Sequence, residues 1–61
     1  MNSLNLPKDP VLLLSFVNTN LRDNYEDLTE FCAAFGADIN DIVGKLRKIN
    51  YVYDEKQNQF K

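Results

Sequence analysis

Apolar residues recur at helical spacing near the start of the chain, on one face of a predicted helix. Asp9 and Pro10 open this stretch. The Asp9 carboxylate can accept hydrogen bonds from free backbone N–H groups, and proline is tolerated at the first helical position because no N–H is needed there. The pattern predicts a helix over residues 10–23. Its apolar stripe contains Leu13, Leu14, Val17 and Leu21.

A second helix is predicted over residues 28–35, where apolar residues again recur at intervals of three and four. Asp27 is suited to cap its first turn, and we expect Glu30 to reach back to the backbone N–H of Asp27, as in a capping box. Gly36 follows directly, and glycine readily adopts the left-handed conformation that ends a helix. The apolar stripe consists of Leu28, Phe31, Cys32 and Phe35.

A third helix is predicted over residues 39–49, with Asp38 as its cap and basic residues near its end, where positive charge suits the helix dipole. Gly44 lies inside this helix. Glycine there costs roughly 0.5–1 kcal/mol relative to alanine, so it indicates either a close approach of another helix or a tolerated weakness. The apolar stripe consists of Ile39, Ile42, Val43, Leu46 and Ile49.

The C-terminal residues predict a β-hairpin, with one strand over residues 51–53, a turn over 54–57 and a return strand over 58–60. Alternate residues of a strand point to the same side. We therefore expect Tyr51 and Tyr53 to pack together onto the first or third helix, with their hydroxyl groups at the rim.

The spacing of the second and third helices matches a helix-turn-helix. This motif needs a small residue in its first helix, a turn residue four positions later and a buried aliphatic residue six positions beyond, and Cys32, Gly36 and Ile42 satisfy it. We expect one small, mainly α domain over residues 1–61, a three-helix helix-turn-helix-like bundle with a short, wing-like β-hairpin over residues 51–60. The same packing also occurs in bundles that bind no DNA, since a fold does not fix a function.

Charge is distributed unevenly, because most acidic residues precede position 42 and most basic residues follow it. A winged-helix regulator would use four basic residues on DNA phosphates, and these are Lys45, Arg47, Lys48 and Lys56. Asp38 and Asp41, at the start of the third helix, would repel the same DNA. The net charge of −2 also lacks the basic excess of a dedicated DNA-binding domain. Binding of nucleic acid is therefore the disfavoured alternative.

The residue inventory argues against catalysis. The chain has no histidine to act as a base near neutral pH and no glycine-rich phosphate loop. Its single cysteine, Cys32, lies in an apolar stripe with no basic residue close by in sequence, which is typical of a buried thiol. One cysteine allows no internal disulfide, and without histidine there is no Cys/His metal cluster. We expect no enzyme activity and no catalytic, cofactor-binding or metal-binding residues.

The sequence carries no sign of a membrane or secretory destination. Its first residues lack the basic start and small-residue cleavage site of a signal peptide. Apolar runs such as residues 11–14 are far shorter than the roughly 20 residues of a membrane-spanning helix. With 44% hydrophobic and 26% charged residues, the composition is that of a folded globule. We expect a cytoplasmic protein without membrane association.

The helix over residues 10–23 has more apolar surface than one neighbouring face requires. Phe16 widens its apolar arc, and Leu12 lies beyond that arc. A chain of 61 residues without a disulfide buries a small core, and self-association is one way to gain stability. We expect a non-enzymatic protein-interaction module that binds a partner protein or a second copy of itself. The candidate interface residues are Leu12, Phe16, Asn18 and Arg22.

Four segments together resemble a family of very short bacterial proteins known only as a domain of unknown function, the one numbered 4250. These segments are residues 5–10, 13–25, 28–32 and 51–60, and the most specific parts are the opening NLPKDP and the closing Tyr-x-Tyr-Asp-x-x-x-Asn-Gln-Phe. Asn50 stands where we expect glycine in that family, at the turn after the third helix. The resemblance implies a small size and a bacterial setting, and it brings no activity and no site residues.

Asn18 and Arg22 lie one turn apart on the first predicted helix, with Asp23 beside them. Two roles are open for this polar cluster. It can hold the hairpin over residues 51–60 in place by hydrogen bonds. Alternatively, Arg22 and Asn18 can present a forked donor to a carboxylate or phosphate of a partner.

Overall fold

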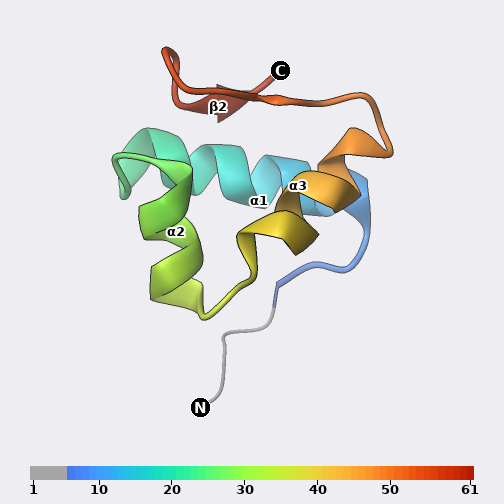
Figure 1. Cartoon of the computed structure of the whole chain (residues 1–61), viewed down its shortest axis with the longest axis horizontal. Helices are drawn as coiled ribbons and strands as arrows, with labels where there is room; N and C mark the ends of the chain where they lie inside the picture. Colours follow the sequence, from blue (N-terminus) through green and yellow to red (C-terminus); the bar gives the residue numbers. More distant parts are fainter. Residues whose placement is uncertain (1–5) are drawn as a thin grey trace.

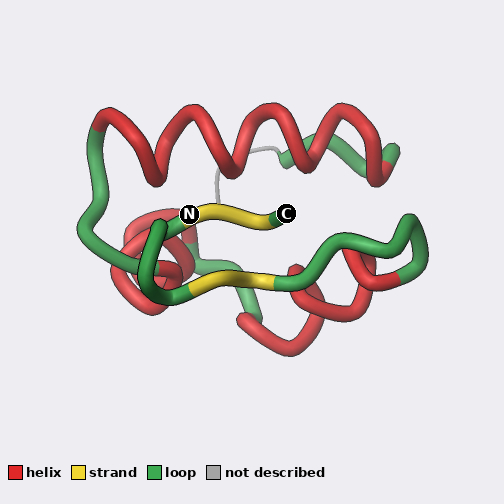
Figure 2. Tube along the Cα trace, turned by 90° about the horizontal axis from the view of Figure 1, so that it is seen from above, coloured by secondary structure: helices red, strands yellow, loops and turns green. Residues whose placement is uncertain are grey.

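The protein folds into three helices and a short C-terminal hairpin, as seen in a computed structural model that describes residues 6–61 (Figure 1). The elements are α1 (Pro10–Asp23), α2 (Leu28–Phe35), α3 (Ile39–Arg47), β1 (Tyr53–Asp54) and β2 (Gln59–Phe60). Helices α2 and α3 pack against α1, and the hairpin contacts α1 through β2. Figure 2 shows β2 lying between α1 and β1. The predicted mainly α bundle with a C-terminal hairpin is confirmed.

Each helix begins at an aspartate whose side chain accepts a hydrogen bond from the first turn. Asp9 accepts from the N–H of Val11 at 3.1 Å, and Asp38 accepts from that of Asn40 at 2.9 Å. Asp27 caps α2 by accepting from the N–H of Glu30 at 2.8 Å. These bonds satisfy backbone donors that have no partner inside the helix.

The predicted partner of the Glu30 carboxylate is wrong by one residue. Its side chain accepts a hydrogen bond from the N–H of Glu26 at 3.2 Å, rather than from that of the capping residue Asp27. The backbone of Asp27 is extended, with φ of −159° and ψ of 173°. With Asp27 in this conformation, the N–H of Glu26, rather than that of Asp27, lies within hydrogen-bond distance of the Glu30 side chain.

Helices α2 and α3 end with the same hydrogen-bond pattern, but one uses glycine and the other asparagine. At the end of α2, Gly36 has φ of 64°, and the N–H of Ala37 donates to the carbonyl of Cys32 at 2.8 Å. After α3, Asn50 has φ of 70°, and the N–H of Tyr51 donates to the carbonyl of Leu46 at 3.0 Å. Both are Schellman closures, and asparagine tolerates the left-handed region better than most residues.

This closure corrects the predicted length of the third helix. Regular α3 ends at Arg47, two residues before the predicted end at position 49. Residues 48–50 form a tightened turn in which the N–H of Ile49 donates to the carbonyl of Leu46 at 3.1 Å. Ile49 still packs against the core from this turn, so the apolar pattern continued after the regular helix had ended.

The hairpin is shorter than predicted. Tyr53 pairs with Phe60 and Asp54 with Gln59 in antiparallel register. Asn58, predicted as part of the return strand, instead lies in the connecting turn with φ of 54°. Two bonds between the backbones of Val52 and Lys61, at 3.1 and 3.0 Å, extend the pairing by one step.

The prediction that the two tyrosines pack together is wrong. Tyr53 lies on β1 and packs against the core, whereas Tyr51 lies outside the strand and is exposed. The backbone N–H of Tyr51 closes α3, so this residue belongs to the end of the helix rather than to the sheet. Strand alternation therefore does not apply between positions 51 and 53.

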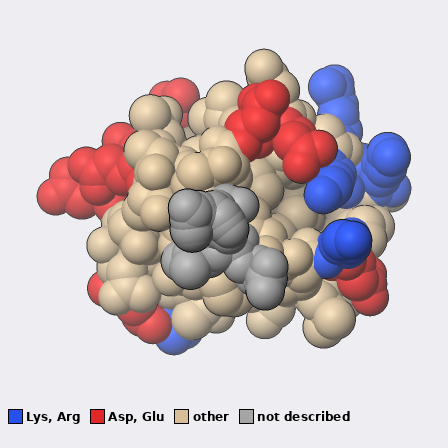
Figure 3. Space-filling model, turned by 90° about the horizontal axis from the view of Figure 1, so that it is seen from below, with Lys and Arg blue, Asp and Glu red and all other residues tan. Residues whose placement is uncertain are grey.

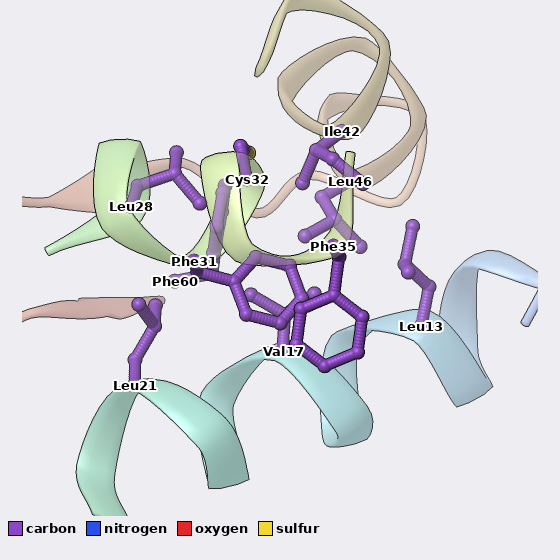
Figure 4. Packing of buried hydrophobic residues seen from close by; sticks show 10 residues of the cluster. All are labelled: Leu13, Val17, Leu21, Leu28, Phe31, Cys32, Phe35, Ile42, Leu46 and Phe60. Atoms are coloured by element: carbon purple, nitrogen blue, oxygen red, sulfur yellow. The ribbon is translucent and has the colours of Figure 1, made fainter. Parts of the chain in front are cut away.

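The core draws on every helix and on the hairpin (Figure 4). Its buried residues are Leu13, Val17 and Leu21 of α1, Leu28, Phe31, Cys32 and Phe35 of α2, Ile42 and Leu46 of α3, and Phe60 of β2. Helix α1 therefore forms one wall of the core, and Phe60 closes the core from the hairpin side. Gly44 lies outside it, because a Cβ added there would meet nothing within 4 Å. Of the two readings of this glycine, the tolerated weakness fits and the close helix approach does not.

Candidate functional site

The hairpin is held onto α1 by the side chain of Asn18. Its amide nitrogen donates to the carbonyl of Phe60 at 3.0 Å, and its amide oxygen accepts from the N–H of Phe60 at 2.8 Å. One side chain thus occupies both backbone groups on the outer edge of β2, as a neighbouring strand would. Of the two roles open for Asn18, the structure shows it holding the hairpin.

A second connection joins the hairpin to α2 through Tyr53. Its hydroxyl group accepts a hydrogen bond from the N–H of Leu28 at 3.2 Å and donates to the side chain of Asn58 at 2.6 Å. The amide of Asn58 in turn donates to the carbonyls of Leu21 and Tyr25, both at 3.0 Å. This network ties the turn of the hairpin to the end of α1 and to the start of α2.

Burial raises the pKa of the Tyr53 hydroxyl group above its ordinary value. The hydrogen bond from Leu28 lowers the pKa, and the negative charges of Asp27, Glu55 and Asp54 raise it. The net effect keeps the hydroxyl protonated, as its donation to Asn58 requires.

The side chains of the closing Tyr-x-Tyr-Asp-x-x-x-Asn-Gln-Phe pattern are largely used by the fold. Tyr53 and Asn58 form the network just described, and Phe60 enters the core. Asp54 accepts hydrogen bonds from the N–H groups of Lys56 and Gln57 at 2.9 and 3.3 Å, which orders the turn. The pattern therefore specifies how a hairpin is built and docked.

Arg22 is exposed and forms an ion pair with its neighbour Asp23. Its guanidinium donates to both carboxylate oxygens, at 2.9 and 3.1 Å. The hydrogen bond and the charge of Asp23 raise the pKa of Arg22, and the hydrogen bond from Arg22 lowers the pKa of Asp23. The pair borders a shallow polar hollow of about 190 Å³ between α1 and the hairpin. This hollow is lined by Asn18, Thr19, Arg22, Gln57, Asn58 and Gln59.

Leu12 and Phe16, the two apolar candidates of α1, have different surroundings. Phe16 is half-buried and packs edge-on against Phe31 and Phe35, with ring centroids 6.2 and 5.5 Å apart. Its side chain therefore belongs to the core margin. Leu12 is 59% exposed, and its neighbour Val11 is 60% exposed.

The four basic candidates are at the surface to different degrees. Lys45 pairs with Asp41 at 3.3 Å on the same face of α3, so its charge is partly compensated. Arg47, Lys48 and Lys56 are exposed. Figure 3 shows most of the Lys and Arg side chains visible in its view gathered at one end, with acidic groups beside them and at the opposite end.

A second hollow, of about 370 Å³, opens beside β1. We call it the edge groove, and it is lined by Asp27, Leu28, Thr29, Ile39, Tyr53 and Glu55. Its apolar lining includes Ile39, which is 37% exposed at the first position of α3. Nothing in the sequence pattern indicated this groove, because its residues come from three separate segments and meet only in the folded chain.

The remaining chemistry of the described chain is limited. Cys32 is buried, and its burial, together with the negative charge of Asp38, raises the pKa of the thiol. Within residues 6–61, no three His, Cys, Asp or Glu side chains are grouped as ligands of a metal ion. In the same part of the chain, every helix is too short or too polar to cross a membrane.

Comparison with known proteins identifies a family, and the description of that family gives no function. Searches of curated proteins and of solved structures found no match. A family model does match, over residues 7–60, and its description is a domain of unknown function, DUF4250. The match includes α1, α2, α3 and the docked hairpin. This chain therefore belongs to the DUF4250 family.

Proposed function

We propose that this chain is a non-enzymatic protein-interaction module that self-associates through the first turn of α1. The observation that carries the proposal is the exposure of Val11 and Leu12, at 60% and 59%. They are adjacent residues at the start of a helix whose opposite face forms a wall of the core. Burying one leucine side chain contributes roughly 1.5–3 kcal/mol. Two copies meeting at this turn would bury two leucine and two valine side chains.

Three of the four residues expected at this surface have partners within the chain. The ring of Phe16 packs against Phe31 and Phe35 and so does not add to the uncovered apolar surface. Asn18 is engaged with Phe60 and Arg22 with Asp23. Support for the interface therefore comes from Leu12 together with Val11.

The non-enzymatic part of the proposal is supported by how the polar side chains are used. Asn18, Tyr53 and Asn58 are committed to docking the hairpin. The one thiol is buried, with a raised pKa that disfavours the nucleophilic thiolate. The chain has no histidine. The groups that remain free are suited to contacts with another macromolecule.

Sedimentation velocity across a wide concentration range tests the self-association. We expect the wild type to sediment faster as concentration rises, and Leu12→Lys to remain a monomer with an unchanged circular dichroism spectrum. Thr19→Lys is the matched control, since it adds the same charge at an exposed position of the same helix, about two turns away from Leu12. A wild type that stays monomeric throughout, or equal effects of the two variants, would contradict the proposal.

A second candidate is a winged-helix-like DNA-binding regulator, favoured by the exposed Arg47 and Lys48 at the end of α3. Three features weigh against it. The hairpin docks on α1 through β2, where Asn18 bonds both backbone groups of Phe60. Asp38 and Asp41 occupy the start of α3. Lys45 is paired with Asp41. Fluorescence anisotropy with mixed-sequence duplex DNA at low salt tests this function, which requires binding that weakens steeply as salt is added.

A further inference from the structure

The two edges of the hairpin are treated differently by the fold. On β2, the outward backbone groups of Phe60 are both bonded to Asn18. On β1, the outward groups belong to Tyr53. Val52 and Lys61 exchange two backbone hydrogen bonds. Hydrogen-bonded and non-hydrogen-bonded pairs alternate along an antiparallel ladder, so in the next pair the N–H and C=O groups of Tyr53 and Phe60 point away from each other. Within residues 6–61, neither outward group of Tyr53 has a hydrogen-bond partner.

The edge groove lies on the β1 side of the hairpin. Tyr53 and Glu55 line it, together with the starts of α2 and α3, and β2 contributes none of the lining among the described residues. In an antiparallel ladder, residues directly opposite each other point to the same face. If another chain paired with β1, its residue opposite Tyr53 would therefore point to the same face as the Tyr53 side chain, toward Leu28 and Ile39.

The charges around the groove are of one sign. Asp27 and Glu55 line it, and no Lys or Arg is among its lining residues. The same two carboxylates, with Asp54, act on the hydroxyl of Tyr53 and raise its pKa in addition to the effect of burial. The lining of the groove therefore combines apolar and acidic side chains, which complements a side-chain pattern of one apolar residue flanked by basic residues.

We propose that β1 and the edge groove bind an extended, basic segment of a partner protein, which adds to the hairpin as a third strand. The segment places an apolar residue opposite Tyr53 and a Lys or Arg two positions to either side, because residues two apart share a face. Backbone bonds to Tyr53 fix its position, and Asp27 and Glu55 select its charge. This surface involves neither Val11 nor Leu12, so the inference stands independently of self-association through α1.

The test uses the blocked peptide Lys-Thr-Ile-Thr-Lys and its acidic counterpart Glu-Thr-Ile-Thr-Glu, titrated into the isotope-labelled full chain. We expect only the basic peptide to bind, with chemical-shift changes centred on the backbone amides of Tyr53, Glu55 and Ile39. Shift changes elsewhere, binding of both peptides alike, or no binding of the basic peptide up to millimolar concentration would overturn the proposal.

Two matched variants make the test specific. Glu55→Lys reverses a charge in the groove, and we expect about tenfold weaker binding because a favourable contact becomes repulsive. Glu26→Lys makes the same change of charge at an exposed position outside the groove and should leave the affinity unchanged. Equal losses in both variants would indicate attraction to net charge alone and would refute the groove.

A second copy of the chain is the other occupant to exclude. Pairing of β1 with β1 of another copy would shift the same amides on dilution without any peptide, and that result would replace the proposal. Leu12→Lys should bind the peptide like the wild type. If the chain does not self-associate but binds the basic peptide, the result contradicts only the proposed self-association. If it self-associates but does not bind the peptide, the result contradicts only this inference.

Discussion

The second half of α1 and its first turn face very different surroundings, although both belong to one continuous helix. Near its middle, Asn18 satisfies the backbone of Phe60, and the end of the helix receives the hydrogen bonds of Asn58. At its start, Val11 and Leu12 are more than half exposed. The difference separates residues that hold the fold together from residues that the fold leaves free for contact with other molecules.

The largest expected effect in the docked region comes from Phe60→Ala. Phe60 is 2% exposed and fills the core from the hairpin side. We expect a loss of about 3–5 kcal/mol in the free energy of unfolding. For a chain of this size that loss approaches the total stability, of roughly 0.05–0.15 kcal/mol per residue. Thermal unfolding followed by circular dichroism should show a largely unfolded chain at room temperature. A well-folded variant would mean that the hairpin is not needed to close the core.

Asn18→Ala should have the next largest effect. It removes both partners of the Phe60 backbone and leaves a partly buried N–H and C=O unsatisfied, which costs about 1–3 kcal/mol. Urea unfolding measures the loss. Thr19→Ala is the matched control, because Thr19 is the exposed next residue of the same helix and should change stability little. Equal effects of the two variants would show that Asn18 acts only through helix propensity.

Tyr53→Phe should cost about 0.5–1.5 kcal/mol at neutral pH, since one hydroxyl group makes two hydrogen bonds. The substitution should also change how the free energy of unfolding depends on pH above neutral pH. Because the pKa of folded Tyr53 is raised, ionisation favours the unfolded chain. Its contribution is complete below the unfolded pKa of about 10 and is lost as pH rises through the higher folded value.

Urea unfolding between neutral pH and pH 11 measures this contribution. The wild type should lose more stability over that range than Tyr53→Phe. Tyr51→Phe is the control, because Tyr51 is exposed and lies outside the sheet. A wild-type profile that is parallel to that of Tyr53→Phe would contradict the assignment.

The smallest expected change is that of Leu12→Ser on the stability of the monomer. Since Leu12 is largely exposed, its replacement should alter the free energy of unfolding by no more than about 0.5 kcal/mol at low protein concentration. A loss of 2 kcal/mol or more there would place Leu12 with Asn18 among the residues that hold the fold. The contrast between the two ends of α1 would then disappear.

Local signals explain why the helices could be predicted from the sequence. Asp9, Asp27 and Asp38 cap the helices at the positions expected, and Gly36 ends α2 in the left-handed conformation. Each of these effects depends on groups within a few residues along the chain. Asn50 takes the place of the expected glycine for the same local reason, because asparagine also tolerates a positive φ.

Predictions that depended on neighbours distant in sequence succeeded less well. The apolar arc of α1 placed Phe16 correctly on the helix, but the aromatic residues of α2 that cover it lie 15 or more positions away. The alternation rule for Tyr51 and Tyr53 failed because the closure of α3 takes up the backbone of Tyr51. The edge groove had no sequence signal, since three separate segments build it.

The sequence by itself determined three capped helices, their apolar faces and a hairpin, since capping and helical periodicity act over short distances, and it shows a chain without histidine. Only the tertiary structure decided that Asn18 serves the hairpin, that Phe16 is covered and Leu12 is not, and that one edge of the hairpin is closed while the other is open. Each of these outcomes depends on which segments meet in space, because a hydrogen-bond partner or a packing neighbour tens of residues away leaves no periodic trace in the chain.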